Sequence, residues 1–98
     1  MAILMTGEAQ GLTPELYAQM LAGLEPLLCQ APGFIAHVAH PVEGGEFRVL
    51  EIWRSKEDSD RFFAAHVAPN LPPGIRPKRR TERLNSLVLG AAAEAASR

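Results

Sequence analysis

The stretch from Phe47 to His66 constrains the fold most, because it reads as a strand that leads directly into a capped helix. Residues 47–54 place two different sets of side chains on alternate positions, which is the period of a strand whose two faces meet different surroundings. Ser55 can accept a hydrogen bond from an unpaired backbone N–H, and the acidic residues after it suit the positive end of a helix. A helix is therefore predicted from Lys56.

The first part of the chain predicts a strand and a long helix. Residues 2–6 form a short apolar run that favours a buried strand. Thr13 and Pro14 then provide a helix cap and a first helical residue. Pro26 lies inside this helix and predicts a kink or a shortened last turn near Glu25. The helix carries one wide apolar stripe, on which the single cysteine also lies, as a core residue or alternatively as a reactive thiol: Leu16, Met20, Leu21, Leu24, Leu27, Leu28 and Cys29.

A second strand precedes the turn sequence Glu-Gly-Gly-Glu, which predicts a hairpin because glycine adopts positive φ without a steric penalty. With a two- or four-residue loop, Val42 lies opposite Phe47. This register places His40 diagonal to Glu51 on one face of the hairpin, and His37 on the other face, toward the helices. An odd-length loop would reassign the faces.

The C-terminal part completes an α+β, ferredoxin-like βαββαβ order, with two helices on one face of a four-stranded antiparallel sheet. Pro69 ends the second helix, a proline-rich connection covers 71–77, and the last strand is predicted over 80–89. We expect one domain over 1–89 and a flexible or frayed helical tail over 90–98. Because both faces of the central hairpin carry apolar residues, we expect a homodimer whose two sheets form a barrel, a dimeric α/β barrel.

Composition excludes several classes of function. The net charge of −1 gives no general attraction to nucleic acid or an anionic membrane, and no segment approaches the ~20 apolar residues that cross a bilayer. One cysteine permits no internal disulfide, which fits a cytoplasmic location. No metal site is expected, since His37 and His40 lie on opposite strand faces. Half of the ten basic residues fall within 76–83, where they either steer an anionic ligand or form a solvated strand edge.

One set of motifs resembles the antibiotic biosynthesis monooxygenase family of dimeric α/β barrels. The matching residues lie within 2–89 and comprise Pro32-Gly33-Phe34, His37, Gly44-Gly45, Glu51-Ile52-Trp53-Arg54-Ser55, Phe62 and His66. The resemblance implies a substrate of the anthrone or quinol type that loses a proton and gives an electron directly to molecular oxygen, with no cofactor. The haem-degrading branch carries an Asn on the first strand, where this sequence has Thr6 and Gly7, so haem degradation is disfavoured.

The candidate catalytic residues are His37, His40 and Trp53. Either imidazole can accept a proton near neutral pH, because the unperturbed pKa of histidine is ~6.5. Trp53 matches the pocket tryptophan of the family by position, and it can equally be a large core residue. The candidate substrate-binding residues are Glu51, Phe62 and His66. Each histidine also has a structural alternative, as a buried, interfacial or solvent-exposed ring.

The sequence therefore predicts a cofactor-independent monooxygenase that acts on a small aromatic or polyketide-like molecule. Two alternatives remain open at this point. One is a cofactor-free cyclase that uses the same base for an aldol-type ring closure, and the other is a barrel that binds a small ligand without catalysis.

Overall fold

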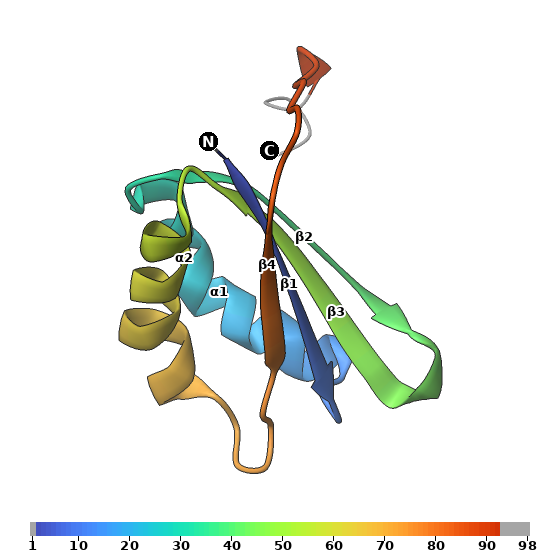
Figure 1. Ribbon diagram of the computed structural model, residues 1–98. Coiled ribbons are helices and arrows are strands. Elements are labelled where there is room, and N and C mark those ends of the chain that lie inside the picture. The colour runs from blue at the N-terminus through green and yellow to red at the C-terminus, as the bar shows by residue number, and fades with distance from the viewer. Residues whose placement is uncertain (1, 93–98) are drawn as a thin grey trace.

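The structure is a computed structural model that describes residues 2–92. Its single sheet has the strand order β2-β3-β1-β4, and every neighbouring pair is antiparallel. Both helices cover the same face of the sheet, and the other face is open (Figure 1). This arrangement confirms the predicted α+β ferredoxin-like fold. The elements are β1 (Ile3–Gln10), α1 (Pro14–Gln30), β2 (Phe34–Val42), β3 (Glu46–Trp53), α2 (Lys56–Phe62) and β4 (Lys78–Arg83).

The predicted caps start both helices. The Thr13 hydroxyl accepts a backbone N–H of α1 at 3.1 Å, and the Ser55 hydroxyl accepts one of α2 at 3.1 Å. α1 runs through Pro26 as one helix and ends at Gln30. Cys29 is exposed, so its assignment to the core was wrong. After α2 the chain continues as a π-helical turn over Phe63–Val67 and a 3₁₀ turn over Ala68–Asn70.

The hairpin between β2 and β3 turns through three residues, Glu43–Gly45, so the predicted register was wrong. Gly44 and Gly45 have φ angles of +84° and +81°, a region that favours glycine. Val42 consequently lies opposite Glu46 rather than opposite Phe47. An odd-length turn shifts the pairing by one residue, and the side-chain assignments of the hairpin change with it.

The shifted register exchanges the partners of the two strand histidines. His37 lies opposite Glu51, and His40 lies opposite Arg48. The predicted neighbourhood of His40 and Glu51 was therefore wrong, and His37 takes that place. Because a strand alternates its side chains between faces, His37 faces the helices while His40 lies on the open face.

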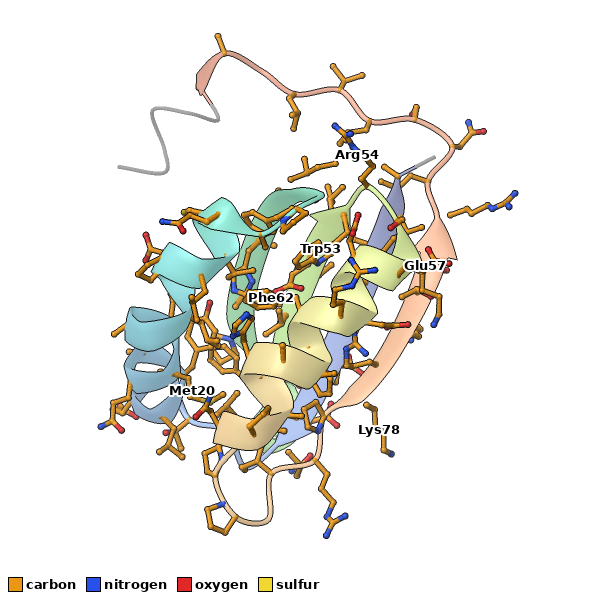
Figure 2. All side chains as sticks on the ribbon, turned by 90° about the vertical axis from the view of Figure 1, so that its left-hand side faces the viewer. Met20, Trp53, Arg54, Glu57, Phe62 and Lys78 are labelled. Atoms are coloured by element: carbon orange, nitrogen blue, oxygen red, sulfur yellow. The ribbon has the colours of Figure 1, made fainter. Side chains whose placement is uncertain are left out.

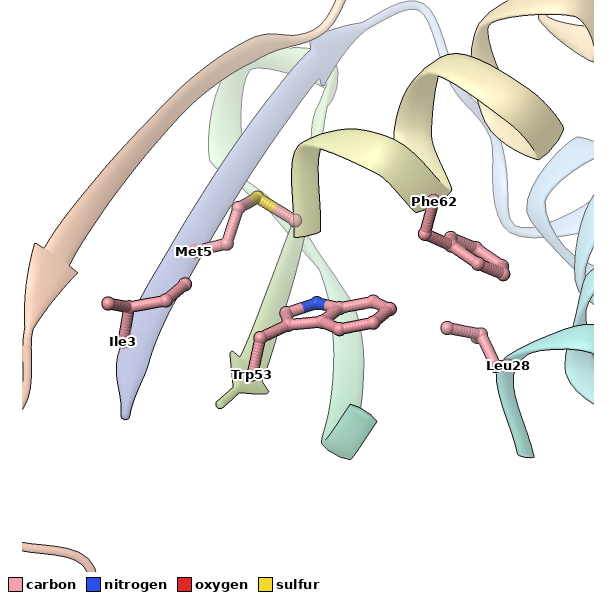
Figure 3. Packing of buried hydrophobic residues seen from close by; sticks show 5 residues of the cluster. All are labelled: Ile3, Met5, Leu28, Trp53 and Phe62. Atoms are coloured by element: carbon pink, nitrogen blue, oxygen red, sulfur yellow. The ribbon is translucent and has the colours of Figure 1, made fainter. Parts of the chain in front are cut away.

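Trp53 is the most deeply buried side chain, with an exposed fraction of 0 %. Its ring packs between β1 and the two helices against Met5, Leu28 and Phe62 (Figure 3). Phe47 anchors a second buried cluster near the other end of the sheet, with Ala9 and Leu12.

β4 ends at Arg83, six residues before the predicted Leu89, and the chain then leaves the sheet as an extended segment (Figure 1). Val88 and Leu89 in this segment are 90 % and 59 % exposed. The predicted tail over 90–98 falls largely on residues 93–98, outside the described part of the chain. No helix within residues 2–92 has the length and apolar character to cross a bilayer. The cytoplasmic location and the domain boundary at residue 89 stay predictions.

Candidate functional site

A cavity of about 100 Å³ lies between the sheet and the two helices, where both buried clusters border it. This volume holds several water molecules or a small organic molecule. Figure 2 shows Phe62 in this layer between α2 and the sheet, with Met20 on the α1 side. Met20 and Leu24 also line an outer groove beside residues 70–72, so they stand between the cavity and the surface. The wall is apolar except for a few side chains with polar groups: Tyr17, His37, Glu51, Ser59 and Arg79.

Three consecutive hydrogen bonds join four side chains at one end of the cavity. The Tyr17 hydroxyl lies 2.6 Å from Nε2 of His37, and Nδ1 of His37 lies 2.7 Å from Oε2 of Glu51. The indole N–H of Trp53 donates to Oε1 of Glu51 at 2.8 Å. We call these four residues, Tyr17, His37, Glu51 and Trp53, the Glu51 network. It links α1, β2 and β3 through side chains alone.

The partners in the Glu51 network fix the direction of each hydrogen bond. A carboxylate only accepts, so Nδ1 of a neutral His37 carries the ring proton and donates it to Glu51. Nε2 then holds a lone pair and accepts the hydroxyl proton of Tyr17. The basic nitrogen of His37 therefore points toward Tyr17, and both residues lie on the cavity wall.

Burial of the Glu51 carboxylate and the His37 ring destabilises the fold unless their polar atoms are hydrogen-bonded. The Glu51 side chain is 11 % exposed and the His37 side chain is 15 % exposed. A buried carboxylate without donors would be destabilised by several kcal/mol, and here it receives one donor on each oxygen. Burial raises the pKa of Tyr17 above its ordinary value, and the nearby Glu51 and Glu25 carboxylates raise it further. Tyr17 therefore stays protonated at neutral pH.

The structure brings together some of the predicted site residues and separates others. His37, Glu51 and Trp53 form one network, and Phe62 lies on the cavity wall. Trp53 packs in the core behind Glu51 and is not part of the wall. His66 packs against Phe62 in a tilted arrangement, with 4.9 Å between ring centroids, and it too lies outside the wall. His40 is exposed on the open face. The functional roles of all these residues stay predictions.

Three polar residues of the wall, Tyr17, Ser59 and Arg79, were missed from the sequence. Tyr17 precedes Leu21 by four residues and Leu24 by seven, so the helical period already placed it on the core face. Arg79 was grouped with its basic neighbours. The strand period of two distinguishes it from Lys78 and Arg80, because alternate residues point to opposite faces.

The described part of the chain does not offer a set of side chains that could ligate a metal ion. Within residues 2–92, no cluster of three or more His, Cys, Asp or Glu side chains could hold a metal ion. The site thus consists of one hydrogen-bonded acid–base network, an apolar cavity and an arginine.

Comparison with known proteins identifies the fold. No protein-family model and no curated protein matches the sequence. Three similar solved structures are SnoaB, a cofactor-independent oxygenase from Streptomyces nogalater, the heme-degrader MhuD from Mycobacterium tuberculosis, and NE2512, a protein of unknown function from Nitrosomonas europaea. SnoaB is 12% identical, with 89% of this chain and 96% of SnoaB covered and a TM-score of 0.62. MhuD is 21% identical, with 90% of this chain and 99% of MhuD covered and a TM-score of 0.62. NE2512 is 19% identical, with 92% of this chain and 93% of NE2512 covered and a TM-score of 0.61. These likenesses confirm the fold that the resemblance to the monooxygenase family predicted.

Tyr17 is the single tyrosine of the sequence, so tyrosinate absorbance reports this residue alone. We expect the pKa of Tyr17 to exceed its ordinary value in the folded protein, and to fall toward that value, without reaching it, in Glu51→Gln. Folding stability should decrease as pH rises past about 10, since the unfolded chain then loses the tyrosine proton first.

The control for this titration is Glu57→Gln, which removes an exposed carboxylate from α2 and should leave the pKa of Tyr17 unchanged. Tyr17→Phe should remove the corresponding part of the alkaline loss of stability. An equal tyrosine pKa in the folded protein and in urea would contradict the described burial of Tyr17.

Proposed function

We propose that this protein is a cofactor-independent monooxygenase for a small aromatic or polyketide-like substrate of the anthrone or quinol type. The observation that carries the proposal is the Glu51 network at the wall of an otherwise apolar cavity. Anthrones and quinols become electron-rich anions on losing one proton, and such anions can give an electron directly to oxygen. A protein that accepts this proton in a dry cavity supplies what the reaction needs. The similarity in fold to SnoaB, described as a cofactor-independent oxygenase, supports the same assignment.

In this mechanism His37 is the base, and Tyr17 is the group that meets the substrate. The Tyr17 hydroxyl passes its proton to Nε2 of His37 as it accepts the proton of the substrate. The two transfers occur together, because the raised pKa of Tyr17 disfavours a free tyrosinate. Glu51 stabilises the imidazolium that forms, through its hydrogen bond to Nδ1.

The oxygen chemistry then needs no electron donor other than the substrate. For an anthrone, the substrate anion gives one electron to oxygen, and the resulting radical pair combines to a peroxide at the carbon that lost the proton. The peroxide takes the proton back from the His37–Tyr17 pair, then loses water to leave a carbonyl. In balance, a CH₂ group and O₂ become C=O and H₂O.

Trp53 acts in this mechanism as a positioning residue. Its N–H donates to Oε1 of Glu51, so Oε2 stays directed at Nδ1 of His37. Phe62 provides an aromatic part of the cavity wall against which a planar substrate can stack.

A cofactor-free cyclase is the second candidate, favoured by the hydroxyl of Tyr17 beside the base. An aldol-type ring closure needs a base to form a carbanion and an acid to protonate the carbonyl oxygen that it attacks. His37 and Tyr17 could take these two roles without oxygen.

Haem, which is bound in the MhuD structure, does not fit this site. Both ring nitrogens of His37 are engaged by Tyr17 and Glu51, so neither has a lone pair available for iron without breaking the network.

We also propose that a second copy of the chain covers the open face of the sheet. Val38 on this face is 59 % exposed, and Val88 beyond β4 is 90 % exposed. The apolar residues of the face share it with the Arg48–Glu8 and Arg80–Glu82 pairs, which could set the orientation of the partner.

Oxygen uptake tests the proposed reaction directly. Flavin-free, chelator-treated protein should consume oxygen with a generic anthrone faster than spontaneous autoxidation. His37→Gln and Tyr17→Phe should lower the rate by about 10²–10⁴-fold, the usual contribution of general acid–base catalysis. His40→Gln, on the same strand and the opposite face, is the matched control and should retain the rate.

Trp53→Phe should lower the rate less than His37→Gln and shift its pH profile, because Glu51 keeps its contact with His37 but loses the indole donor. Full activity in His37→Gln would refute the assigned base. Ring-closed product without oxygen uptake would indicate the cyclase, and ligand-dependent stabilisation without product would indicate a binding protein.

Light scattering tests the dimer. We expect a dimer at micromolar concentration, and Val38→Glu should shift it toward monomer, since a buried unpaired charge is costly. Leu27→Glu is the control, because Leu27 is 42 % exposed on the helix layer, away from the proposed interface. A stable wild-type monomer at this concentration would overturn the dimer.

A further inference from the structure

Arg79 enters the cavity from the edge of the sheet opposite to His37. His37 lies on β2 and Arg79 on β4, the two outer strands, with β3 and β1 between them. Three strand spacings separate their backbones by about 14 Å across the sheet. The two side chains therefore reach into one cavity from opposite sides.

The guanidinium of Arg79 is only partly satisfied by the protein. Nη2 donates to the Ser59 hydroxyl at 3.0 Å, Nη1 donates to Asp60 at 3.3 Å, and Cζ lies 4.3 Å from the centroid of Phe63. Nε is buried and has no hydrogen-bond partner within residues 2–92. Buried N–H groups normally have partners, so this one calls for an acceptor that the described residues do not supply.

The charge of Arg79 is also incompletely balanced. Asp60 is 41% exposed and binds Lys56 at 2.5 Å, closer than it binds Arg79. The carboxylate is thus shared between two cations, and it lies on the solvent side of the guanidinium. Toward the cavity, the guanidinium of Arg79 meets apolar side chains and the ring of Phe63.

Gly7 leaves the cavity floor open beside Arg79. Gly7 pairs with Arg79 in the sheet and lies inside β1, where its φ angle is not positive. The backbone conformation therefore does not demand glycine. A Cβ at this position would make ordinary van der Waals contacts, at 3.8 Å with the Arg79 side chain and at 3.6 Å with Met5, and would occupy space on the cavity floor. A strand glycine of this kind leaves room for a ligand to approach.

We propose that Arg79 binds the oxyanion of the substrate through Nε–H and the free proton of Nη2. The proposal rests on the proposed function and specifies its substrate class. Nε and Nη2 form one edge of the guanidinium, and that edge suits an oxygen anion.

The two ends of the cavity then act on one conjugated molecule. The Tyr17–His37 pair removes a proton at one end, and the negative charge moves through the ring system to an oxygen at the far end, beside Arg79. The substrate class is thus an anthrone whose acidic C–H lies across the ring from its carbonyl oxygen, so that loss of the proton places negative charge on that oxygen. Arg79 stabilises the anion that reacts with oxygen, which makes it a catalytic residue.

Binding of 4-nitrophenol tests this inference without any turnover, because its phenol and phenolate forms have distinct absorbance. Wild-type protein should bind the phenolate at least about tenfold more tightly than the phenol, which lowers the pKa of the bound probe by about one unit. Arg79→Gln should abolish this preference. Arg79→Lys, which keeps the charge but has no fork, should retain part of it.

Arg76→Gln is the matched control, because Arg76 is exposed, lies outside the sheet and should not affect the probe. Fluorescence of the single tryptophan verifies that each variant is folded. An equal phenolate preference in wild type and Arg79→Gln, or no probe binding by wild type, would overturn the inference.

His37→Gln separates the inference from the proposed function. This variant should keep the phenolate preference, since Arg79 provides it, while losing oxygen uptake. A wild-type protein that shows the preference but never consumes oxygen would refute the monooxygenase and leave the anion site intact.

Discussion

The buried carboxylate of Glu51 is the constraint on which the site depends. An ionised side chain in the middle of a sheet, facing the helices, would destabilise the fold unless donors met both of its oxygens. Trp53 supplies one donor from the same strand and His37 supplies the other from the neighbouring strand. Tyr17 then extends the network to α1, so one carboxylate fixes a side chain on each of three elements. The largest core residue thus serves two purposes, because the ring of Trp53 fills the core while its N–H holds the carboxylate of Glu51.

A purely structural role does not account well for the Glu51 network, although it would account for a buried cluster of apolar side chains. Apolar side chains of similar size would avoid the desolvation of a carboxylate. The network also ends at a cavity, not in a packed core. Arg79 is a second indication of a bound molecule, because a buried N–H without a partner costs stability unless another molecule provides the acceptor. A histidine at one end of the cavity and an arginine at the other suit the proposed reaction, which forms an anion.

The sequence was sufficient to predict the topology, but not which histidine lies beside Glu51. Turn and cap residues such as Thr13 and Ser55 act locally, so they placed both helices correctly. The register depended on the length of the glycine turn, and a three-residue turn was not distinguishable from a two- or four-residue one. That one-residue difference moved the partnership with Glu51 from His40 to His37. Arg79 was missed because the last strand was predicted to begin at residue 80, whereas β4 begins at Lys78, so the strand period was not applied to it.

The tautomer of His37 tests the account most directly. Nitrogen chemical shifts of the histidine rings distinguish a protonated Nδ1 from a protonated Nε2, and His37→Gln assigns the signals among the three histidines. With the ring neutral, the account predicts a proton on Nδ1, hydrogen-bonded to Glu51, and an unprotonated Nε2 that accepts from Tyr17. Glu51→Gln should weaken that preference, because it removes the carboxylate charge. A proton on Nε2 in the wild type, or a mixture of tautomers like that of an exposed ring, would contradict the assigned base and the mechanism built on it.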